Sequence, residues 1–532
     1  MSASHSRLLC YDNNGKQKGN NMHRPEPNMN LAAHILKQAD LSADRAAILF
    51  EGQSWTYGEF AQRVRKIAGL FKERGVCMGD RVAFLGFNQP AFLETMVAAN
   101  ALGAIFVPLN FRLTGEELAF IISDAGVHTL IVDPVLTAVI EPVLDRLPCR
   151  QYFEVGDVTA KFEALEPAMV EASALHEAVL LGAHDTLLIM YTSGTTGLPK
   201  GAMLTHGNFV WNNINASYAF GGIRDDVTLS TAPLFHIGGL NTGVITALQL
   251  GNPLVILRNF EPGDVLALIE QHQVTHMFGA PAMFLFMSQH PKFDETDLSS
   301  IKMFIVGGAP VPEPLLRLYG ERGVQFCQGY GLTETSPFSS FLGPDKALEK
   351  LGSAGLPPVL SDIRIVDADN RPLGPNERGE ICLSGPNIMK GYWNRPEATA
   401  SAIDTEGWFH SGDIGYLDEE GFLYICDRVK DMVISGGENV YPAEVESVLF
   451  AHESVAEVAV IGLPDDKWGE AVTAVVALNA GHELSLEELR AFAADKLAKY
   501  KLPLRLHIVD ALPRNPAGKV LKFQLREQLS QG

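Results

Sequence analysis

The sequence has few cysteines, and they lie far apart. Its 532 residues contain six: Cys10, Cys77, Cys149, Cys327, Cys382 and Cys426. None stands in a CxxC pair or in a ligand cluster with histidine, so we expect no zinc site. Six unclustered cysteines in a chain of this size are typical of free thiols in a reducing compartment. We therefore predict a cytoplasmic location.

The sequence also lacks a long apolar run and an excess of positive charge. No run is long enough to cross a bilayer, and the N-terminus lacks the continuous apolar core of a secretory signal. Lys and Arg number 42 against 63 Asp and Glu, a net charge of −21. This acidic balance argues against broad binding to nucleic acid or to an anionic membrane. It still allows a local basic groove for phosphates.

One nucleotide signature is missing as well. No GxGxxG follows an early strand, which disfavours a dinucleotide-binding oxidoreductase. The composition is otherwise that of a globular protein, with 46% hydrophobic and 20% charged residues. A chain of this length is enough for two or three packed units.

Most of the chain alternates short apolar strands with amphipathic helices, the pattern of α/β layers. Strands are predicted at residues 81–86, 129–132, 187–190, 253–257, 276–279 and 303–307, and helices around 60–71, 264–272 and 312–319. From about residue 352 the strands become shorter and turns more frequent, which predicts an antiparallel, β-rich subdomain. Its strands are expected at residues 363–366, 380–383 and 422–425.

A smaller α+β segment follows residue 428. Helices are predicted at residues 442–450 and 485–500, and strands at 456–461, 472–478 and 506–509. The fold class is therefore α/β and α+β. A large N-terminal domain of layered α/β sheets covers residues 29–429, with the β-rich subdomain at about 352–429, and a small C-terminal domain covers 430–532. The polar residues 1–28 are predicted to be a disordered leader.

Residues 191–201 carry the strongest chemical signal. They read Tyr-Thr-Ser-Gly-Thr-Thr-Gly-Leu-Pro-Lys-Gly and follow the apolar strand at 187–190. Small glycine and hydroxyl residues expose backbone N–H groups, and Lys200 adds a positive charge, so the loop is suited to holding phosphates. It is not a Walker A loop, because the glycine-to-lysine spacing differs and Gly201 follows the lysine.

This loop resembles the phosphate-loop signature of the adenylate-forming superfamily, which includes acyl-CoA synthetases, adenylation domains of peptide synthetases and firefly luciferase. Five further stretches resemble motifs of the same superfamily, in the same order: residues 232–239, 328–335, 408–413, 427–440 and 513–520. Several matches in the right order identify a family far better than one short motif does. We therefore interpret the chain as a member of this superfamily.

The resemblance implies a nucleotide site. In it, Tyr330 stacks on adenine, Thr333 donates to the α-phosphate, Glu334 binds Mg²⁺, Asp413 accepts from the ribose hydroxyls, and Arg428 contacts ribose and phosphate. A carboxylate has two oxygens and suits a cis-diol, and Mg²⁺ favours oxygen ligands. The other implied ATP and AMP contacts are Thr192, Ser193, Gly194, Thr195, Thr196, Gly308, Ala309, Pro310, Gln328 and Gly329.

The resemblance also implies a C-terminal domain that moves. Lys430 matches the hinge, and Lys519 matches the mobile lysine that holds the substrate carboxylate and the α-phosphate. The pair Gly436 and Gly437 matches a loop that guides the pantetheine arm of CoA. With Lys519, the implied catalytic residues are Lys200, Thr333 and Glu334.

Other residues are assigned to the acyl and pantetheine channels. His236 stands where the family carries an aromatic residue beside both channels, and we interpret it as a packing or gating residue rather than a base. Gly238, Gly307 and Ser336 are predicted to line the acyl pocket with it. Because these segments are mostly apolar or small, we expect an acid with an apolar tail. A medium- or long-chain fatty acid is slightly favoured over an aromatic acid such as a hydroxycinnamate.

The implied activity is an ATP-dependent ligation of a small carboxylic acid to CoA through an acyl-adenylate, with Mg²⁺ as cofactor. One alternative is an adenylating enzyme that loads the thiol of a carrier protein, although only a short polar tail follows Lys519. A second is a non-catalytic module that binds a nucleotide or an acyl group. A luciferase-like monooxygenase is disfavoured, because nothing in the sequence marks oxygen chemistry. The sequence is compatible with a homodimer.

Overall fold

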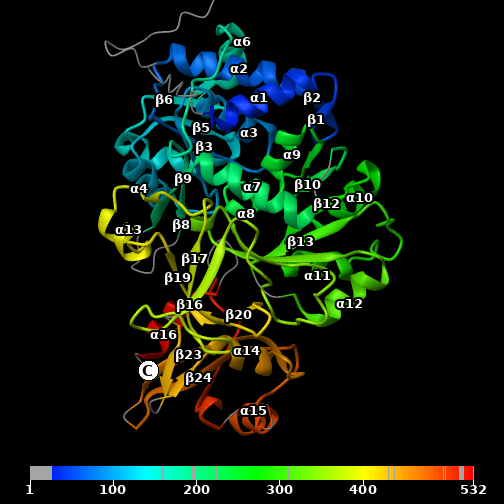
Figure 1. Ribbon diagram of the computed structural model, residues 1–532, viewed down its shortest axis with the longest axis vertical. Helices are drawn as coiled ribbons and strands as arrows, with labels where there is room; N and C mark the ends of the chain where they lie inside the picture. Colours follow the sequence, from blue (N-terminus) through cyan, green and yellow to red (C-terminus); the bar gives the residue numbers. More distant parts are fainter. Residues whose placement is uncertain are drawn as a thin grey trace, which may run out of the picture.

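The N-terminal domain is built around two eight-stranded sheets, which lie side by side in Figure 1. The structure, a computed structural model, describes residues 27–156, 161–192, 199–221, 224–308, 311–428, 431–435, 438–465, 467–494, 496–497, 499–514 and 520–530. A four-stranded sheet and a five-stranded sheet follow along the chain. The predicted division into layered α/β sheets, a β-rich subdomain and a small C-terminal α+β domain is confirmed.

The first sheet has the order β15-β14-β13-β12-β10-β11-β1-β2. Its central strands run parallel, while β2 and β15 pair antiparallel at the two edges. Its strands are β1 (Ala46–Phe50), β2 (Gln53–Thr56), β10 (Thr228–Ser230), β11 (Leu254–Ile256), β12 (His276–Gly279), β13 (Met303–Gly307), β14 (Phe326–Gly331) and β15 (Phe338–Leu342).

The second sheet has the order β18-β9-β8-β4-β3-β5-β6-β7. Its parallel centre is nearly continuous in apolar residues, as expected for strands covered on both faces, and every residue of β5 is buried. Its strands are β3 (Arg81–Leu85), β4 (Ile105–Leu109), β5 (Val127–Val132), β6 (Gln151–Glu154), β7 (Glu163–Ala164), β8 (Thr186–Thr192), β9 (Lys200–Thr205) and β18 (Gly391–Tyr392).

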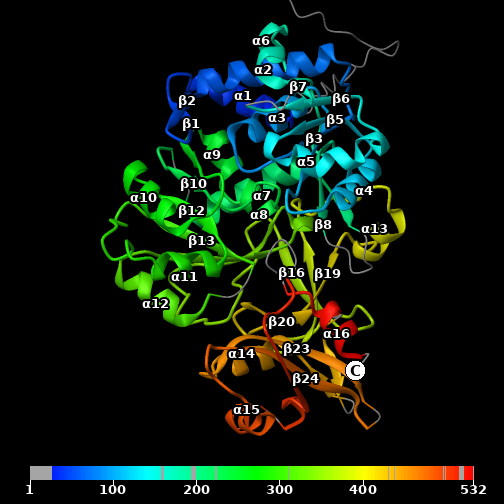
Figure 2. The same ribbon diagram turned by 180° about the vertical axis from the view of Figure 1, so that it is seen from behind.

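Helices cover these sheets. In Figure 2, α10, α11 and α12 flank the first sheet, and α4 and α5 flank the second. The helices of the domain are α1 (Leu31–Leu41), α2 (Tyr57–Glu73), α3 (Pro90–Ala101), α4 (Gly115–Ala125), α5 (Thr137–Ile140), α6 (Leu165–Glu171), α7 (His206–Phe220), α8 (Ile237–Asn241), α9 (Val244–Leu250), α10 (Pro262–His272), α11 (Pro281–Gln289), α12 (Glu313–Glu321) and α13 (Pro396–Ala402). Short 3₁₀ turns are η1 (Pro134–Leu136), η2 (Glu141–Arg146) and η3 (Thr333–Thr335).

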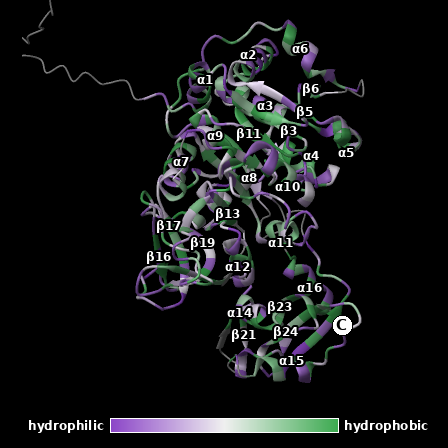
Figure 3. Ribbon diagram, turned by 90° about the vertical axis from the view of Figure 1, so that its right-hand side faces the viewer, coloured by the Kyte–Doolittle hydropathy of each residue, from purple (hydrophilic) through white to green (hydrophobic). Residues whose placement is uncertain are grey.

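The β-rich subdomain is an antiparallel sheet of β16 (Asp362–Val366), β17 (Gly379–Ser384), β19 (Phe409–Leu417) and β20 (Leu423–Arg428), in that order. Figures 1 and 3 place the C-terminal domain beyond it, at the end of the molecule opposite α2 and α6. That domain contains β21 (Val433–Ser435), β22 (Glu438–Val440), α14 (Pro442–Phe450), β23 (Val455–Asp465), β24 (Gly469–Leu478), α15 (Leu486–Ala493), η4 (Lys499–Lys501), β25 (Arg505–Val509) and α16 (Lys522–Ser530).

One prediction about the C-terminal domain is wrong. The helix expected at residues 485–500 ends at Ala493, and among the described residues before β25 only the turn η4 follows it. The short polar tail after Lys519 contains the helix α16, which is not among the predicted helices. Its Leu525 is 2% exposed and lies in one apolar cluster with Ile461 and Val475. A helix that buries only one narrow apolar stripe has a mostly polar composition. For this reason its sequence does not differ clearly from that of an unstructured polar tail.

The long helix of the N-terminal domain shows why the predictions succeeded elsewhere. Thr56 and Glu59 form a reciprocal capping box at the start of α2, and the apolar stripe that includes Phe60 and Phe71 is fully buried. No helix among the described residues is both long and apolar enough to span a membrane.

A largely buried ion pair ties α2 to α3. The guanidinium of Arg63 donates to both oxygens of Glu94, with Nε–Oε1 at 2.5 Å and Nη2–Oε2 at 3.0 Å. The side chain of Glu94 is 1% exposed, and its burial raises the pKa of the carboxyl although Arg63 opposes this. Glu166 of α6 shares the same guanidinium. Arg63 therefore neutralises a carboxylate that water does not reach.

We predict that Arg63→Met lowers the free energy of unfolding by about 3–5 kcal/mol, because it leaves a buried charge without its partner. The measurement is urea-induced unfolding followed by intrinsic fluorescence. The control is Arg146→Met, which breaks the exposed pair with Glu116 and should leave the free energy of unfolding almost unchanged. Equal losses in the two variants would show that the pair between α2 and α3 has no special role.

Candidate active site

Three of the predicted motifs meet where strands of two different sheets come together. β14 of the first sheet carries Gln328, Gly329 and Tyr330, and η3 directly after it carries Thr333 and Glu334. β19 of the four-stranded sheet carries Asp413. Tyr330 and Asp413 are 83 positions apart in the chain, yet their side chains are in contact.

The hydroxyl of Tyr330 donates a hydrogen bond to Oδ2 of Asp413 at 2.7 Å. Asp413 is 5% exposed and is the direct register partner of Arg428 on β20. The structure therefore places the predicted adenine residue, the predicted ribose residue and the backbone of Arg428 next to one another. Gln328 supports the same region, since its Oε1 accepts from the backbone N–H of Val311 at 3.1 Å.

Glu334 and Lys200 are joined through a residue that the sequence analysis did not identify. The hydroxyl of Tyr392 donates to Oε1 of Glu334 at 2.8 Å, and the ammonium of Lys200 lies 5.4 Å from the centre of the Tyr392 ring. β18 pairs with β9, which sets Tyr392 opposite Ala202 and near Lys200. Glu334 is 8% exposed, so an oriented carboxylate and a lysine face the same aromatic side chain.

The carboxylate of Glu334 is suited to binding Mg²⁺. A largely buried carboxylate, held in one orientation by a tyrosine hydroxyl, offers the hard oxygen ligand that this ion prefers beside phosphates. The same environment changes the acidity of Tyr392. Burial, and to a smaller extent the charge of Glu334, raise the pKa of Tyr392 well above its ordinary value. Its hydroxyl therefore stays protonated and acts as a donor.

The residues predicted to line the acyl pocket surround one further aromatic ring. A Cβ atom on Gly238 would lie 2.8 Å from the ring of Phe278, and one on Gly307 would lie 3.1 Å from it. A side chain at 238 would therefore displace the ring of Phe278, and one at 307 would press against it. Gly308 follows with a φ of +89°, a left-handed conformation that favours glycine.

His236 forms the N-cap of α8, where its Nδ1 accepts from the backbone N–H of Gly238 at 3.3 Å. The ring of His236 is in contact with solvent, although many protein atoms surround it. We therefore place it in a recess of the surface. Desolvation, with a smaller contribution from the charge of Arg112, lowers the pKa of His236 below its usual value. The ring is therefore neutral at pH 7, in line with its interpretation as a packing residue.

Several hydroxyls near this pocket are buried without a hydrogen-bond partner among the described residues. They are those of Ser230, Thr231, Thr242 and Ser336. The first three line a cavity of about 20 Å³ that Phe278 also borders. That volume holds about one water molecule and excludes an acyl chain. The backbone carbonyl of Ser336 accepts from the Asn241 amide at 2.6 Å.

Some predicted site residues lie outside the described part of the chain. They are Ser193, Gly194, Thr195, Thr196, Ala309, Pro310, Lys430, Gly436, Gly437 and Lys519. Thr192 and Lys200, which flank the phosphate loop, are described and are register partners across β8 and β9.

One residue of the site is missing from the sequence predictions. Tyr392 belongs to a strand of two residues that pairs with a partner about 190 positions away, and no local sequence pattern indicates this pairing.

The prediction that no cysteine clusters with histidine is wrong. Sγ of Cys382 lies 3.5 Å from Nδ1 of His410, and the same Nδ1 lies 2.8 Å from Oε2 of Glu380. Cys382 and His410 are 28 positions apart and become neighbours only because they are register partners across β17 and β19. A search for ligands that are close in sequence does not find such a pair.

Comparison with known proteins agrees with this geometry. A family model for AMP-binding enzymes matches residues 35–393, and one for the AMP-binding enzyme C-terminal domain matches residues 444–519. A feruloyl-CoA synthase of Amycolatopsis sp is 42% identical over 505 residues, which are 94% of this chain and 99% of that protein. A long-chain-fatty-acid–CoA ligase, FadD13, of Mycobacterium tuberculosis is 41% identical over 483 residues, 89% of this chain and 93% of that protein.

A solved structure is similar throughout. The o-succinylbenzoate coenzyme A synthetase (MenE) of Bacillus subtilis, in complex with ATP and magnesium ion, has a TM-score of 0.83 and 35% identity, covering 93% of this chain and 99% of that one. The chain therefore belongs to the family of AMP-binding enzymes. Within it, the chain is an AMP-forming acid–thiol ligase, which joins an acid to CoA through an acyl-adenylate at the expense of ATP.

We predict that Tyr392→Phe lowers kcat/KM for adenylation by about tenfold, because one hydrogen bond to a charged group contributes about 1.5 kcal/mol. The Mg²⁺ concentration for half-maximal rate should rise as Glu334 loses its fixed orientation. ATP–pyrophosphate exchange measures both. The control is Tyr152→Phe on β6, which should leave both values unchanged. An unaltered Mg²⁺ dependence in Tyr392→Phe would contradict this role for the hydroxyl.

Proposed function

We propose that this ligase activates an acid with an apolar tail, either a medium- or long-chain fatty acid or an aromatic acid. The observation that supports an apolar tail is the pair Gly238 and Gly307 against the ring of Phe278, and the contacts of Lys200, Tyr392 and Glu334 with those of Tyr330 and Asp413 support the ATP-dependent step. A cation, a carboxylate suited to Mg²⁺ and a tyrosine–aspartate pair are what a nucleotide triphosphate requires of its site.

In the first step, a carboxylate oxygen of the acid attacks the α-phosphorus of ATP. A P–O bond forms to give the acyl-adenylate, and the bond to the β-phosphate oxygen breaks to release pyrophosphate. Both reactants are anions, so the site must supply positive charge and alignment. We assign this to Lys200, to Lys519 and to a donor from Thr333. Mg²⁺ on Glu334, when bound, neutralises phosphate charge.

In the second step, the thiolate of CoA attacks the acyl carbonyl, the C–S bond forms and AMP leaves. We propose that Gly436 and Gly437 then border the pantetheine arm and that His236 lies at the meeting of its channel with the acyl pocket. The desolvated, neutral ring of His236 suits an apolar channel and removes no proton.

Nucleotide recognition is proposed for the residues around Tyr330. Its ring stacks on adenine, Asp413 accepts from the ribose, and Arg428 reaches ribose and phosphate. Gln328, Gly329 and Gly308 form the adenine wall with Ala309 and Pro310. Thr192, Ser193, Gly194, Thr195 and Thr196 form the phosphate loop with Lys200.

The C-terminal domain, with its limits at residues 430 and 532, is proposed to rotate about Lys430 between the two steps. The ion pair Arg378–Glu444, at 3.5 Å, joins the loop before β17 to α14. Its side chains are 37% and 32% exposed, so it contributes little to stability and opposes rotation weakly. Rotation lets one site use Lys519 in the first step and admit CoA in the second.

The names of the relatives represent both classes of acid: one is a feruloyl-CoA synthase and the other is a long-chain-fatty-acid–CoA ligase. Glycines at 238 and 307 against Phe278 favour a flat or slender apolar tail. Mg²⁺, ATP and CoA complete the set of small molecules. A cytoplasmic location agrees with the five cysteines of the described residues, which form no disulfide.

We expect CoA-dependent AMP release with one acid class from a panel of fatty and hydroxycinnamic acids. Lys519→Ala should slow adenylation by at least about 100-fold, because it removes a donor to the reacting phosphate. The same variant should still convert a supplied acyl-adenylate to the thioester. Lys499→Ala, which removes an exposed lysine of the same domain, serves as the control and should behave as the wild type.

Other outcomes would redirect the assignment. Pyrophosphate release without consumption of CoA would favour a carrier protein as the thiol partner. ATP binding without turnover of any acid would favour the non-catalytic module. Loss of thioester formation from the acyl-adenylate in Lys519→Ala would contradict a role confined to the first step.

A further inference from the structure

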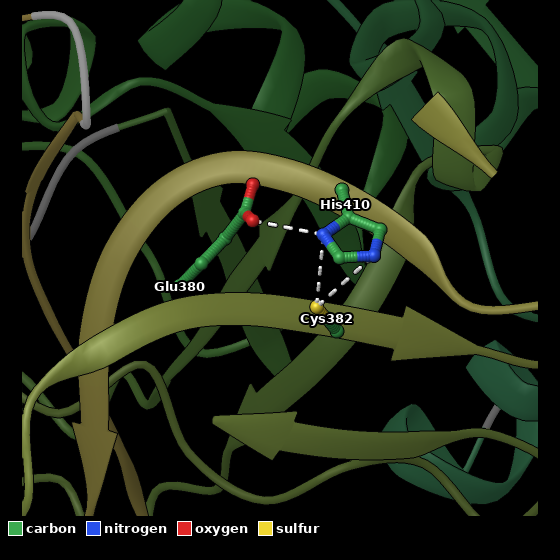
Figure 4. Close-up of side chains that lie close together, drawn as sticks. All are labelled: Glu380, Cys382 and His410. Atoms are coloured by element: carbon green, nitrogen blue, oxygen red, sulfur yellow. Dashed lines mark hydrogen bonds and ion pairs between the residues drawn. The ribbon is translucent and has the colours of Figure 1, made fainter. Parts of the chain in front are cut away.

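A group of metal-ligating side chains lies outside the residues used by the ligase reaction. Glu380 and Cys382 stand two positions apart on β17 and therefore face the same side of the strand. His410 on the neighbouring strand β19 is the register partner of Cys382. One ligand atom from each of the three lies within 4.8 Å of the other two, as Figure 4 shows.

The spacing of the sulfur and the nearer ring nitrogen agrees with a tetrahedral zinc site. Zn–N and Zn–S bonds of about 2.1 and 2.3 Å at a tetrahedral angle separate the two ligand atoms by about 3.6 Å. Sγ of Cys382 and Nδ1 of His410 are 3.5 Å apart. Sγ also lies 4.0 Å from Nε2 of the same ring, so the imidazole turns on binding to direct Nδ1 at the ion. Oε2 of Glu380 is 2.8 Å from the same Nδ1, so this carboxylate would retreat by about half an ångström to reach a bonding position.

The surroundings of His410 also suit a bound metal. Its second nitrogen, Nε2, lies 3.7 Å from Oδ2 of Asp404, so a small turn of the ring gives the hydrogen bond by which a carboxylate orients a metal-binding histidine. The guanidinium of Arg364 opposes a cation near Cys382, but it is held by Asp404 at 2.8 Å and Glu406 at 3.1 Å. The side chains of His410 and Glu380 are 21% and 27% exposed, which gives an ion a path from solvent.

We propose that Glu380, Cys382 and His410 bind one Zn²⁺ ion, with a fourth position open to water. Sulfur and imidazole ligands favour zinc over magnesium or calcium, which prefer oxygen alone. On binding, the thiol proton of Cys382 leaves to water and the thiolate bonds to the metal. The Nδ1 of His410 loses its hydrogen bond with Glu380 and binds the metal. The proton of the neutral imidazole is then on Nε2, on the side of Asp404.

Cobalt(II) provides a test that does not depend on ligase activity. Added to the full-length, metal-stripped protein without nucleotide, Co²⁺ should produce a near-ultraviolet thiolate-to-cobalt band that saturates at one equivalent. One equivalent of Zn²⁺ should abolish the band, because zinc binds the same ligands more tightly. Cys382→Ser should lose the band. Asp404→Asn should keep it but weaken metal affinity by about 10–100-fold, as expected for a residue that orients a ligand.

The matched control is Cys149→Ser, since Cys149 is also a partly buried thiol whose pKa burial raises to about 12. It should keep the band and the affinity of the wild type. ATP binding and the thermal midpoint of metal-free Cys382→Ser verify that it folds; His410→Asn replaces it if it does not. No band in the wild type, or a band that survives in both Cys382→Ser and His410→Asn, would overturn the proposal and leave the three residues as a hydrogen-bonded structural group.

Discussion

The pairing of the two-residue strand β18 with β9 is the constraint on which the phosphate side of the site depends. It places Tyr392 between Lys200, at the start of β9, and Glu334, at the end of β14. β9 belongs to the second sheet, and Glu334 lies in η3 between β14 and the edge strand β15 of the first, so Tyr392 connects the two sheets at this point. The spacing of a cation and a carboxylate around a polyphosphate is thereby set by backbone hydrogen bonds rather than by flexible side chains.

The sequence predicted much of this arrangement, because its signals are local. The capping box of α2, the continuous apolar strands and the loop before Lys200 can each be recognised within about a dozen residues. The rest depends on pairing between distant segments. The contacts of Tyr392 with Glu334 and of Cys382 with His410 follow from strand register, which an isolated sequence does not reveal. The same is true of α16, whose buried face is defined only by its contact with the sheet of β23 and β24.

The predicted acyl side of the site depends on the absence of side chains. Gly238 and Gly307 come from α8 and β13, and each lies against the same ring of Phe278. Because the ring is confined by both, the shape of this region is set by the backbones of two separate elements. Desolvation, with a smaller contribution from the charge of Arg112, lowers the pKa of His236 at the start of α8, so this ring adds no charge of its own.

One irregularity in β19 separates the nucleotide side from the cluster around Cys382. Glu380 and Cys382 are two positions apart on β17, but their partners Ile414 and His410 are four apart on β19, so the ladder is shifted between them. Gly412, inside this bulge, has a φ of +69°. Its N–H donates to Oε1 of Glu380 at 3.0 Å, which compensates for the interrupted ladder. Because a bulge redirects side chains, Asp413 turns to Tyr330 while His410 faces Cys382. Glu380 thus holds the backbone beside the predicted ribose residue with one oxygen and His410 with the other.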